Sequence, residues 1–341
     1  MKAVVLVGGE GTRLRPITET IPKPLVPLMD RASLDHVLDH LARHDVHEVV
    51  LSSSYLEEEF RAFIKARRGD PKITWITEEA PLGTGGAIVN ALGKERTRRG
   101  DEPFLALNGD ILTDLDLTAM LERHRARGAV ATIALTPVED ARPYGLVPTE
   151  ADGRVIEFRE KPADLVHGDI NAGTYVLTPS ALDAWDAGHN ASIEREIFPA
   201  LIADGLPVYG FVSAAYWMDL GTPEQYLQAH FDILDGKVGF EPAYPSPLVL
   251  DGATVDASAH LGPWVVVGAG ASVGPDATVA DSVLHPWASV GEGAKVTGSI
   301  LGPSSRVGEG ANLRDSVIGE DAIVPAGSVL TGARIAAARE P

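Results

Sequence analysis

The chain has 341 residues, enough for two domains that each bury a hydrophobic core. Its 29 basic and 48 acidic residues leave a formal net charge of −19, which argues against binding nucleic acid or an anionic membrane through a basic surface. The absence of cysteine excludes disulfides, thiol nucleophiles, cysteine-ligated zinc and iron–sulfur clusters.

The first predicted element is a buried strand, Ala3–Val7, which is followed by two glycines. This apolar run of five residues is too short for the core of a signal peptide or for a membrane-spanning helix. We therefore expect a cytoplasmic protein.

Up to about Gly239, short apolar runs alternate with amphipathic stretches, which indicates an α/β sheet covered on both faces. A helix begins at Ser33, and a second helix runs from the capping box at Thr222 to about Leu234. The turn Asp152-Gly153 predicts an inserted hairpin. The further predicted strands are Val49–Leu51, Phe104–Leu107, Val130–Leu135, Thr174–Leu177 and Val208–Val212.

After Pro242, Pro245 and Pro247 the helical period disappears and apolar residues recur every six positions. Each restart of the phase comes after five residues, so the later coils repeat every 17 residues. Glycines often follow the inward residue, where we expect tight corners, as at Gly268, Gly274, Gly291, Gly308 and Gly319. The predicted inward residues are Val249, Val255, Leu261, Val267, Val273, Val279, Leu284, Val290, Val296, Leu301, Val307, Leu313, Ile318, Val324 and Leu330.

This repeat resembles the left-handed parallel β-helix of hexapeptide-repeat proteins. The sequence then divides into a catalytic domain at 1–239, a proline-rich joint at 240–248 and a β-helix at 249–335.

A glycine loop follows the first strand and contains Gly8, Gly9 and Gly11, with Arg13 and Arg15 beside them. Glycines let backbone N–H groups close on phosphate oxygens. The loop lacks the third glycine of a dinucleotide fingerprint and the Gly-Lys-Ser/Thr of a Walker loop. An ordinary strand-to-helix turn remains an alternative, although such a turn does not require the two arginines.

The segment Pro22-Lys23-Pro24-Leu25 completes a longer motif, Gly-Gly-x-Gly-Thr-Arg-Leu-Arg-Pro followed by Pro-Lys-Pro-Leu. This motif resembles that of the sugar-1-phosphate nucleotidyltransferases, and within them the mannose-1-phosphate guanylyltransferases. The resemblance implies a Rossmann-like domain with a mixed, mostly parallel sheet, followed by the left-handed β-helix. The implied reaction joins a nucleoside triphosphate to a sugar 1-phosphate and releases pyrophosphate.

A phosphate monoester is largely dianionic at neutral pH, so this reaction needs no general base. It needs fixed cations and Mg²⁺ to align two polyanions and to stabilise the leaving pyrophosphate. Lys23 suits the α-phosphate, and Arg13 suits the β- and γ-phosphates. Asp110, at the end of a predicted strand, is the first expected Mg²⁺ ligand, and the resemblance makes Asp219 the second.

The resemblance also implies a nucleotide site that includes Glu78 as the reader of the base. An acceptor-only carboxylate suits the neighbouring donors of guanine better than the edge of uracil or thymine, so we expect GTP. The expected nucleotide-binding residues are Leu6, Gly8, Gly9, Gly11, Thr12, Arg13, Lys23, Glu78, Gly83, Thr84 and Asp110.

For the sugar phosphate, the resemblance assigns Lys161 to the phosphate, Glu160 and Asn171 to sugar hydroxyls, and Gly145 and Gly173 to close backbone approach. Mannose is the favoured sugar. Glucose 1-phosphate with dTTP or UTP, and a cyclitol 1-phosphate with GTP, are the alternatives.

Two other functions are alternatives to this reaction. Acyl transfer would use His260 or His285 of the β-helix as a base, but no cluster of cations for coenzyme A accompanies them. A regulatory homologue that binds nucleotide sugars without turnover tends to lose loop or metal residues, whereas this chain keeps them together. We further expect a homo-oligomer assembled through the β-helix, with no nucleic acid or membrane partner.

Overall fold

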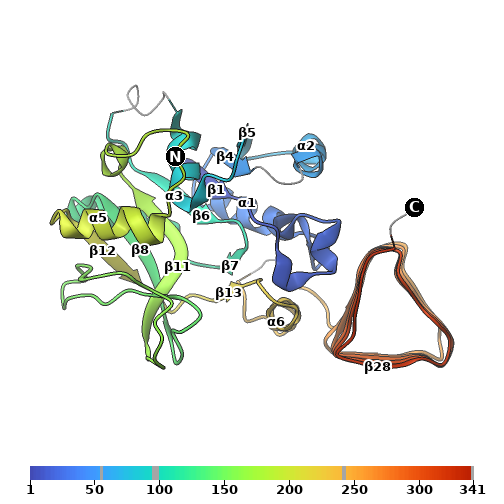
Figure 1. Cartoon of the computed structure of the whole chain (residues 1–341). Coiled ribbons are helices and arrows are strands. Elements are labelled where there is room, and N and C mark those ends of the chain that lie inside the picture. Colours follow the sequence, from blue (N-terminus) through green and yellow to red (C-terminus); the bar gives the residue numbers. More distant parts are fainter. Residues whose placement is uncertain (54–56, 94–99, 240–242, 339–341) are drawn as a thin grey trace. The chain divides into compact units, whose positions relative to one another are not determined.

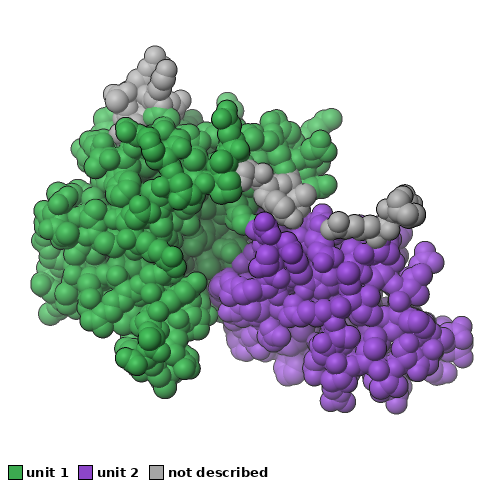
Figure 2. Space-filling model, in the orientation of Figure 1, with its two compact units in different colours: residues 1–9, 36–217 green, residues 10–35, 218–341 purple. Residues whose placement is uncertain are grey.

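The computed structural model describes residues 1–53, 57–93, 100–239 and 243–338. Pro242 and the start of the predicted joint lie outside these residues. Contacts divide the chain into two compact units, coloured in Figure 2: unit 1 holds residues 1–9 and 36–217, and unit 2 holds residues 10–35 and 218–341. The segment 10–35 thus groups with the C-terminal repeats.

Unit 1 is built on a mixed nine-stranded sheet (Figure 1). Its parallel part joins β6, β1, β4 and β5, and β11 runs antiparallel to β6 and β8. The strands are β10 (Arg159–Glu160), β9 (Gly145–Leu146), β11 (Gly168–Leu177), β6 (Phe104–Asn108), β1 (Lys2–Leu6), β4 (Glu48–Ser53) and β5 (Lys72–Thr77), with β8 (Ala131–Val138) beside β11 and β12 (Val208–Val212) beside β8.

The sheet is buried on both faces, as the continuous apolar runs predict. Val4 and Ala106 belong to the main core cluster, and the alternate residues Ala3, Val5 and Leu105 are equally buried. The helices and turns are α1 (Ser33–Arg43), α2 (Glu57–Ala66), α3 (Gly83–Leu92), α4 (Leu117–Arg127), η5 (Pro179–Leu182), the π-helix η6 (Ile193–Ile197) and α5 (Phe198–Ala203), with the short strands β7 (Ile111–Thr113) and β13 (Trp217–Asp219).

The strands predicted from the sequence are all present, and β11 begins six residues before its predicted start at Thr174. The expected turn at Asp152-Gly153 is confirmed by an antiparallel bridge between Thr149 and Val155. Gly153 has a φ of 92°, which explains why glycine stands there.

Unit 2 begins with three short 3₁₀ turns and a small hairpin, and α6 (Pro223–Leu234) precedes its β-helix. The Thr222 hydroxyl accepts from the Gln225 N–H at 3.3 Å, which confirms the predicted cap. The N-terminal elements are η1 (Thr12–Leu14), η2 (Ile17–Glu19), η3 (Lys23–Leu25), β2 (Pro27–Leu28) and β3 (Arg31–Ala32).

The β-helix consists of three stacked sheets of parallel strands, which form a triangle when viewed end-on (Figure 1). This arrangement is consistent with the expected left-handed β-helix. The strands are β14 (Leu248–Val249), β17 (Val265–Val267), β20 (Ser282–Leu284), β23 (Ile300–Leu301), β26 (Val317–Ile318) and β29 (Arg334–Ile335) in the first sheet; β15 (Thr254–Val255), β18 (Ser272–Val273), β21 (Ser289–Val290), β24 (Arg306–Val307) and β27 (Ile323–Val324) in the second; and β16 (His260–Leu261), β19 (Thr278–Ala280), β22 (Lys295–Thr297), β25 (Asn312–Arg314) and β28 (Val329–Thr331) in the third.

The predicted inward ladder is buried from Val267 to Val324. Val249 is an exception and is 44% exposed, because it lies in the end strand of its sheet where no earlier coil covers it. Val255, Leu261 and Leu330, also near the ends of the stack, are only half-buried.

The glycines that follow the inward residues begin tight turns, as expected: the Ala271 N–H donates to the Gly268 carbonyl at 3.0 Å, and the Ala311 N–H donates to the Gly308 carbonyl at 3.2 Å. The need for glycine comes from close packing of successive coils and not from a left-handed backbone. None of the five has a positive φ. A Cβ on Gly308 would lie 2.5 Å from the backbone nitrogen of Ala326 in the next coil.

A serine ladder of Ser282, Ser299 and Ser316 closes the shortened corner of three successive coils. The N–H of Ser299 donates to the Ser282 hydroxyl at 3.0 Å, and the N–H of Ser316 donates to the Ser299 hydroxyl at 3.1 Å. Each hydroxyl in turn donates to a carbonyl two residues earlier. These serines therefore supply acceptors for buried N–H groups where the five-residue step occurs.

Among the described residues, no helix is both long enough and apolar enough to cross a membrane.

Candidate active site

The residues predicted for catalysis are distributed over both units. Arg13, Lys23 and Asp219 belong to unit 2, whereas Asp110 and the predicted base and sugar residues belong to unit 1. Each group is described within its own unit.

The glycine loop, residues 8–16, turns tightly at two of its glycines. Gly9 has a φ of 114° and Gly11 a φ of 59°, a region that favours glycine. A Cβ on Gly11 would also lie 3.1 Å from the Cβ of Lys23, so this glycine lets the loop approach the lysine backbone. The Thr18 hydroxyl donates to the Gly11 carbonyl at 2.7 Å and holds the turn.

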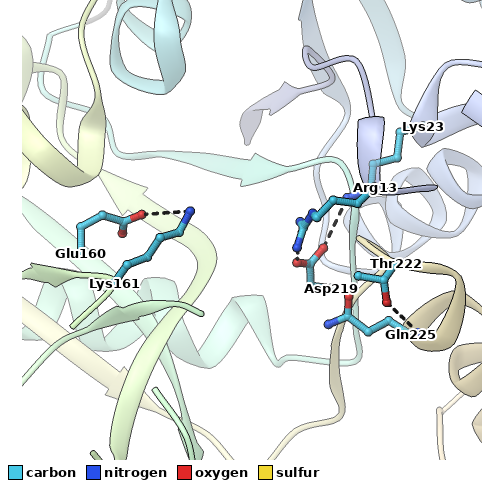
Figure 3. A network of polar contacts seen from close by, with 7 residues as sticks. All are labelled: Arg13, Lys23, Glu160, Lys161, Asp219, Thr222 and Gln225. Atoms are coloured by element: carbon cyan, nitrogen blue, oxygen red, sulfur yellow. Dashed lines mark hydrogen bonds and ion pairs between the residues drawn. The ribbon is translucent and has the colours of Figure 1, made fainter. Parts of the chain in front are cut away.

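Asp219 joins the two predicted cations (Figure 3). The Lys23 Nζ lies 3.3 Å from Asp219 Oδ1, and Arg13 Nη2 lies 3.5 Å from Asp219 Oδ2. Lys23 and Asp219 are 10% and 16% exposed, while Arg13 is 64% exposed. Two positive charges face one carboxylate, so this cation cluster (Arg13, Lys23 and Asp219) keeps a net positive charge that can attract a phosphate.

The backbone around Lys23 is fixed by short-range hydrogen bonds. The Leu25 N–H donates to the Pro22 carbonyl at 2.7 Å, and the Ser33 hydroxyl donates to the Pro24 carbonyl at 2.8 Å. The lysine therefore projects from a rigid turn, as its flanking prolines predict.

Gly221 packs against the cation cluster, and the sequence analysis did not single it out. A Cβ there would lie 2.6 Å from Arg13 Nη2 and 3.0 Å from Asp219 Oδ1. Its position two residues after Asp219, before the Thr222 cap, was the available signal.

Arg15, the second arginine of the glycine loop, forms an ion pair with Glu10: its Nη2 lies 2.9 Å from Glu10 Oε2.

Asp110 lies just beyond the carboxyl end of β6. Leu6 of β1 pairs with Asn108 of β6, and the Gly109 N–H donates to the Leu6 carbonyl at 2.8 Å. Asp110 therefore lies at the same sheet edge as Gly8, where ligands of doubly wound folds bind.

The donor chemistry of Asp110 and Asp219 fits a hard divalent cation. Among the described residues, no three His, Cys, Asp or Glu side chains gather in one place to hold a metal.

The carboxylate of Glu78 already accepts two hydrogen bonds within unit 1. The carboxylate is 8% exposed, its Oε1 accepts from the Ser52 hydroxyl at 2.8 Å, and its Oε2 accepts from the Leu82 N–H at 3.1 Å. Oε1 thus ties this segment to β4, and Oε2 holds the turn that leads into α3. The predicted reading of guanine by Glu78 stays a prediction.

Gly83 and Thr84 likewise pack against a neighbouring segment of unit 1. Gly83 has a φ of 69°, and a Cβ there would lie 2.6 Å from the Ala191 carbonyl oxygen. The Thr84 hydroxyl donates to Glu194 Oε2 at 2.6 Å and accepts from the Ile193 N–H at 3.0 Å. Glu194, which the sequence analysis missed, therefore anchors the start of α3.

The predicted sugar-phosphate residues gather around β9, β10 and β11. Gly145 pairs with Glu160 in the β9–β10 ladder, and a Cβ on Gly145 would lie 2.7 Å from the Phe158 ring. Lys161 Nζ lies 3.9 Å from Glu160 Oε1 (Figure 3). Partial burial raises the pKa of the Glu160 carboxyl, which the charge of Lys161 partly opposes.

Asn171 and Gly173 form a bulge in β11, where the register against β8 shifts. The Gly173 N–H donates to Asn171 Oδ1 at 3.0 Å, and Asn171 Nδ2 donates to the Tyr175 hydroxyl at 2.8 Å. Gly173 has a φ of 71°, and a Cβ there would lie 2.7 Å from Asn108 Nδ2. The bulge therefore brings the backbone of β11 against the end of β6.

Two aromatic residues beside this bulge were not predicted as part of the site. Trp217 Nε1 donates to the Ala172 carbonyl at 2.9 Å, and its ring meets Tyr144 edge-on at 5.3 Å between centroids. Trp217 comes two residues before Asp219 in the sequence, which was the signal available.

The two histidines of the β-helix, His260 and His285, lie in different surroundings. His260 is exposed on β16, whereas His285 is buried and its Nε2 lies 2.9 Å from the Tyr226 hydroxyl. Burial lowers the pKa of His285 to about 3. His285 therefore stays neutral and away from solvent.

Comparison with known proteins gives two family matches. A family model described as "Nucleotidyl transferase" matches residues 2–236, and one described as "GMPPB C-terminal domain" matches residues 244–340.

Similar proteins cover most of the chain. "Mannose-1-phosphate guanylyltransferase" of Mycobacterium tuberculosis is 41% identical over 83% of this chain and 79% of its own length. "Mannose-1-phosphate guanylyltransferase 1" of Arabidopsis thaliana is 38% identical over 82% of this chain and 76% of its own length. The crystal structure of HddC from Yersinia pseudotuberculosis is 31% identical, has a TM-score of 0.58 and covers 67% of this chain and 97% of that chain. The same values hold for HddC complexed with GMP-PN.

Proposed function

Because the chain belongs to the nucleotidyl transferase family, we propose that it transfers the GMP group of GTP to mannose 1-phosphate and releases pyrophosphate. Relatives named for this activity span most of the chain, and HddC has been solved with GMP-PN. The observation that carries the proposal is the cation cluster, in which one carboxylate holds a rigid lysine and a more exposed arginine.

This reaction requires the protein to align the two anionic substrates and to stabilise the charge on their phosphates. An oxygen of mannose 1-phosphate attacks the α-phosphorus of GTP, and the bond from that phosphorus to the oxygen bridging to the β-phosphate breaks. The attacking group is already largely dianionic near pH 7, so no side chain has to remove a proton. Fixed cations must instead offset the repulsion between the two anions.

Lys23 and Arg13 differ in solvent exposure, and we assign them to different phosphates. Lys23 is nearly buried on a rigid turn, which suits a single fixed contact with the α-phosphate. Arg13 is largely exposed, and its planar guanidinium suits the β- and γ-phosphates. Asp219 holds both cations in place before the substrate arrives, which lowers the cost of ordering them.

Members of this family generally use a divalent metal. We assign Mg²⁺ to this role, held by Asp110 and Asp219 together with phosphate oxygens of the substrates. When bound, the ion would neutralise charge on the phosphates.

The sugar phosphate is assigned to the cluster around β9–β11 in unit 1. Lys161 would contact the phosphate, and Glu160 and Asn171 would accept from and donate to sugar hydroxyls. Gly145 and Gly173 would let the sugar approach the backbone. Glu78, Gly83 and Thr84 would form the wall beside the base, with Gly8, Gly9, Gly11, Thr12 and Leu6 around the phosphates.

A substrate matrix tests the proposal: GTP, UTP, dTTP, CTP and ATP, each with mannose, glucose and cyclitol 1-phosphates, followed by pyrophosphate release. We expect the fastest turnover with GTP and mannose 1-phosphate. A clear preference for UTP or dTTP with glucose 1-phosphate, or for a cyclitol 1-phosphate, would overturn the substrate assignment. Binding of GDP-mannose without turnover of any pair would instead indicate a regulatory homologue.

We also propose that residues 1–239 carry the substrates and that the β-helix, residues 249–335, assembles subunits into a homo-oligomer after the joint at 240–248. Ile323 and Val329, in late strands of the β-helix, are exposed apolar residues that such an interface would cover. Sedimentation as a monomer at micromolar concentration would contradict this. A cytoplasmic location completes the proposal, and cell fractionation tests it.

A further inference from the structure

We propose that Arg334, in the last coil of the β-helix, is a positioning residue that holds the glycine loop in the conformation that binds the triphosphate. The inference rests on the proposed function, because it assumes that this loop binds the triphosphate. It goes further in assigning a role in nucleotide binding to a residue of the β-helix.

The contact is a fork between one guanidinium nitrogen and two carbonyls of the loop. Arg334 Nη1 donates to the carbonyl oxygen of Arg13 at 3.0 Å and to that of Arg15 at 2.7 Å. Both carbonyls lie at the C-terminal end of η1, where a helical turn leaves its carbonyls without donors from within the turn. The positively charged guanidinium strengthens both hydrogen bonds to these carbonyls.

Further contacts join the C-terminal part of unit 2 to the segment 10–35. The Ala337 N–H donates to Glu19 Oε2 at 3.2 Å, close to the Arg334 contact. Tyr226 of α6 donates its hydroxyl proton to the Pro27 carbonyl, and His285 Nε2 lies 2.9 Å from the same hydroxyl. The segment that carries both Arg13 and Lys23 is thus held near each of its ends.

This support adds to the contact of the Arg13 side chain with Asp219 and acts on the backbone that carries this arginine. Its side chain is mostly exposed, and its contact with Asp219 spans 3.5 Å. If the carbonyls of Arg13 and Arg15 are released, the loop must be ordered again each time a triphosphate binds, and that ordering opposes binding. Since Arg334 holds the backbone, its loss should weaken nucleotide binding more than it slows the chemical step.

Arg334 can be replaced without leaving a buried defect. Its side chain is exposed and lines an open groove of about 810 Å³ beside α6, together with Gly332 and Asp315. Substitution there removes the fork but opens no cavity in the apolar core of the β-helix. Arg306, exposed on β24, is a matched control because it lies on another sheet of the same β-helix.

The test compares Arg334→Ala, Arg334→Lys and Arg306→Ala in the full chain. For Arg334→Ala we expect the KM for GTP to rise about tenfold with a smaller change in kcat, and Tm to stay within a few degrees of the parent. Amide hydrogen exchange in residues 12–19 should become faster. Arg334→Lys, which keeps the charge and N–H donors, should recover part of the affinity, and Arg306→Ala should match the parent.

Two results would overturn the inference. One is an Arg334→Ala protein whose loop exchange and KM for GTP equal those of Arg306→Ala. The other is a loss of activity that follows a large fall in Tm without faster exchange confined to the loop. If the parent protein releases no pyrophosphate with any substrate pair, the proposed function fails, and the exchange comparison still tests whether Arg334 holds the loop.

Discussion

The ammonium of Lys23 and the carboxylate of Asp219 form an ion pair across 196 residues of sequence, with Nζ and Oδ1 3.3 Å apart. Because the pair is largely buried, the lysine is held at one place and cannot sample the many positions of a surface side chain. Asp219 thus has two assigned roles, as the partner of the cations and as a metal ligand, and these can be separated by experiment.

The first prediction concerns the charge of Lys23. Lys23→Met removes the ammonium but keeps much of the apolar stem, so the transition-state charge on the α-phosphate loses a fixed partner. We expect kcat/KM to fall by about 10²–10³-fold. Pyrophosphate release measures this, with Lys65→Met as control because Lys65 is exposed on α2. Equal activity of the two variants would refute the assignment of Lys23.

The second prediction separates the two roles of Asp219. EDTA should abolish turnover, and added Mg²⁺ should restore it. In Asp219→Asn the side chain binds a hard cation less well, so the Mg²⁺ concentration for half-maximal activity should rise about tenfold or more. Asp110→Asn should behave in the same way.

Activity that survives EDTA would contradict the metal requirement. If Asp219→Asn lowers kcat at every Mg²⁺ concentration without shifting the midpoint, Asp219 acts only by holding Arg13 and Lys23.

The third prediction concerns Glu78, whose two oxygens accept from Ser52 and Leu82. In Glu78→Gln an amide NH₂ replaces one acceptor and faces a donor. Leaving that buried donor unsatisfied should cost about 1–3 kcal/mol of unfolding free energy. If Glu78 also reads guanine, the ratio of kcat/KM for GTP over UTP should fall as well. A loss of stability with an unchanged ratio would show that another group selects the base.

The fourth prediction is a pH dependence of stability from His285. Burial lowers its pKa to about 3 in the folded chain, whereas an unfolded histidine titrates near 6.5. Between these values the unfolded state binds a proton that the folded state does not, so stability decreases as pH falls from about 6.5 toward 3.

His285→Gln removes this titration and should reduce the slope of unfolding free energy against pH in that range. His260→Gln, at an exposed position, is the matched control and should retain the parent slope. Chemical denaturation at a series of pH values measures both. Parallel slopes for all three proteins would mean that His285 does not remain neutral in the fold.

Much of the fold and of the site could be predicted from spacing along the chain. The six-residue period placed the buried ladder of the β-helix from Val267 to Val324, because a side chain's direction in a regular coil depends only on its position in the repeat. The glycine loop and the proline-flanked lysine were recognisable for a similar reason, since glycine and proline restrict the backbone locally.

Other features depended on partners that no local pattern specifies. Glu78 looked free to read a base, yet both of its oxygens meet donors within unit 1. Arg334 reaches the carbonyl of Arg13 across 321 positions, and neither residue type nor spacing indicates that contact. The strength of a hydrogen bond depends on distance and direction in space, so the chain order that revealed the repeat and the motif could not reveal which side chains hold the loop.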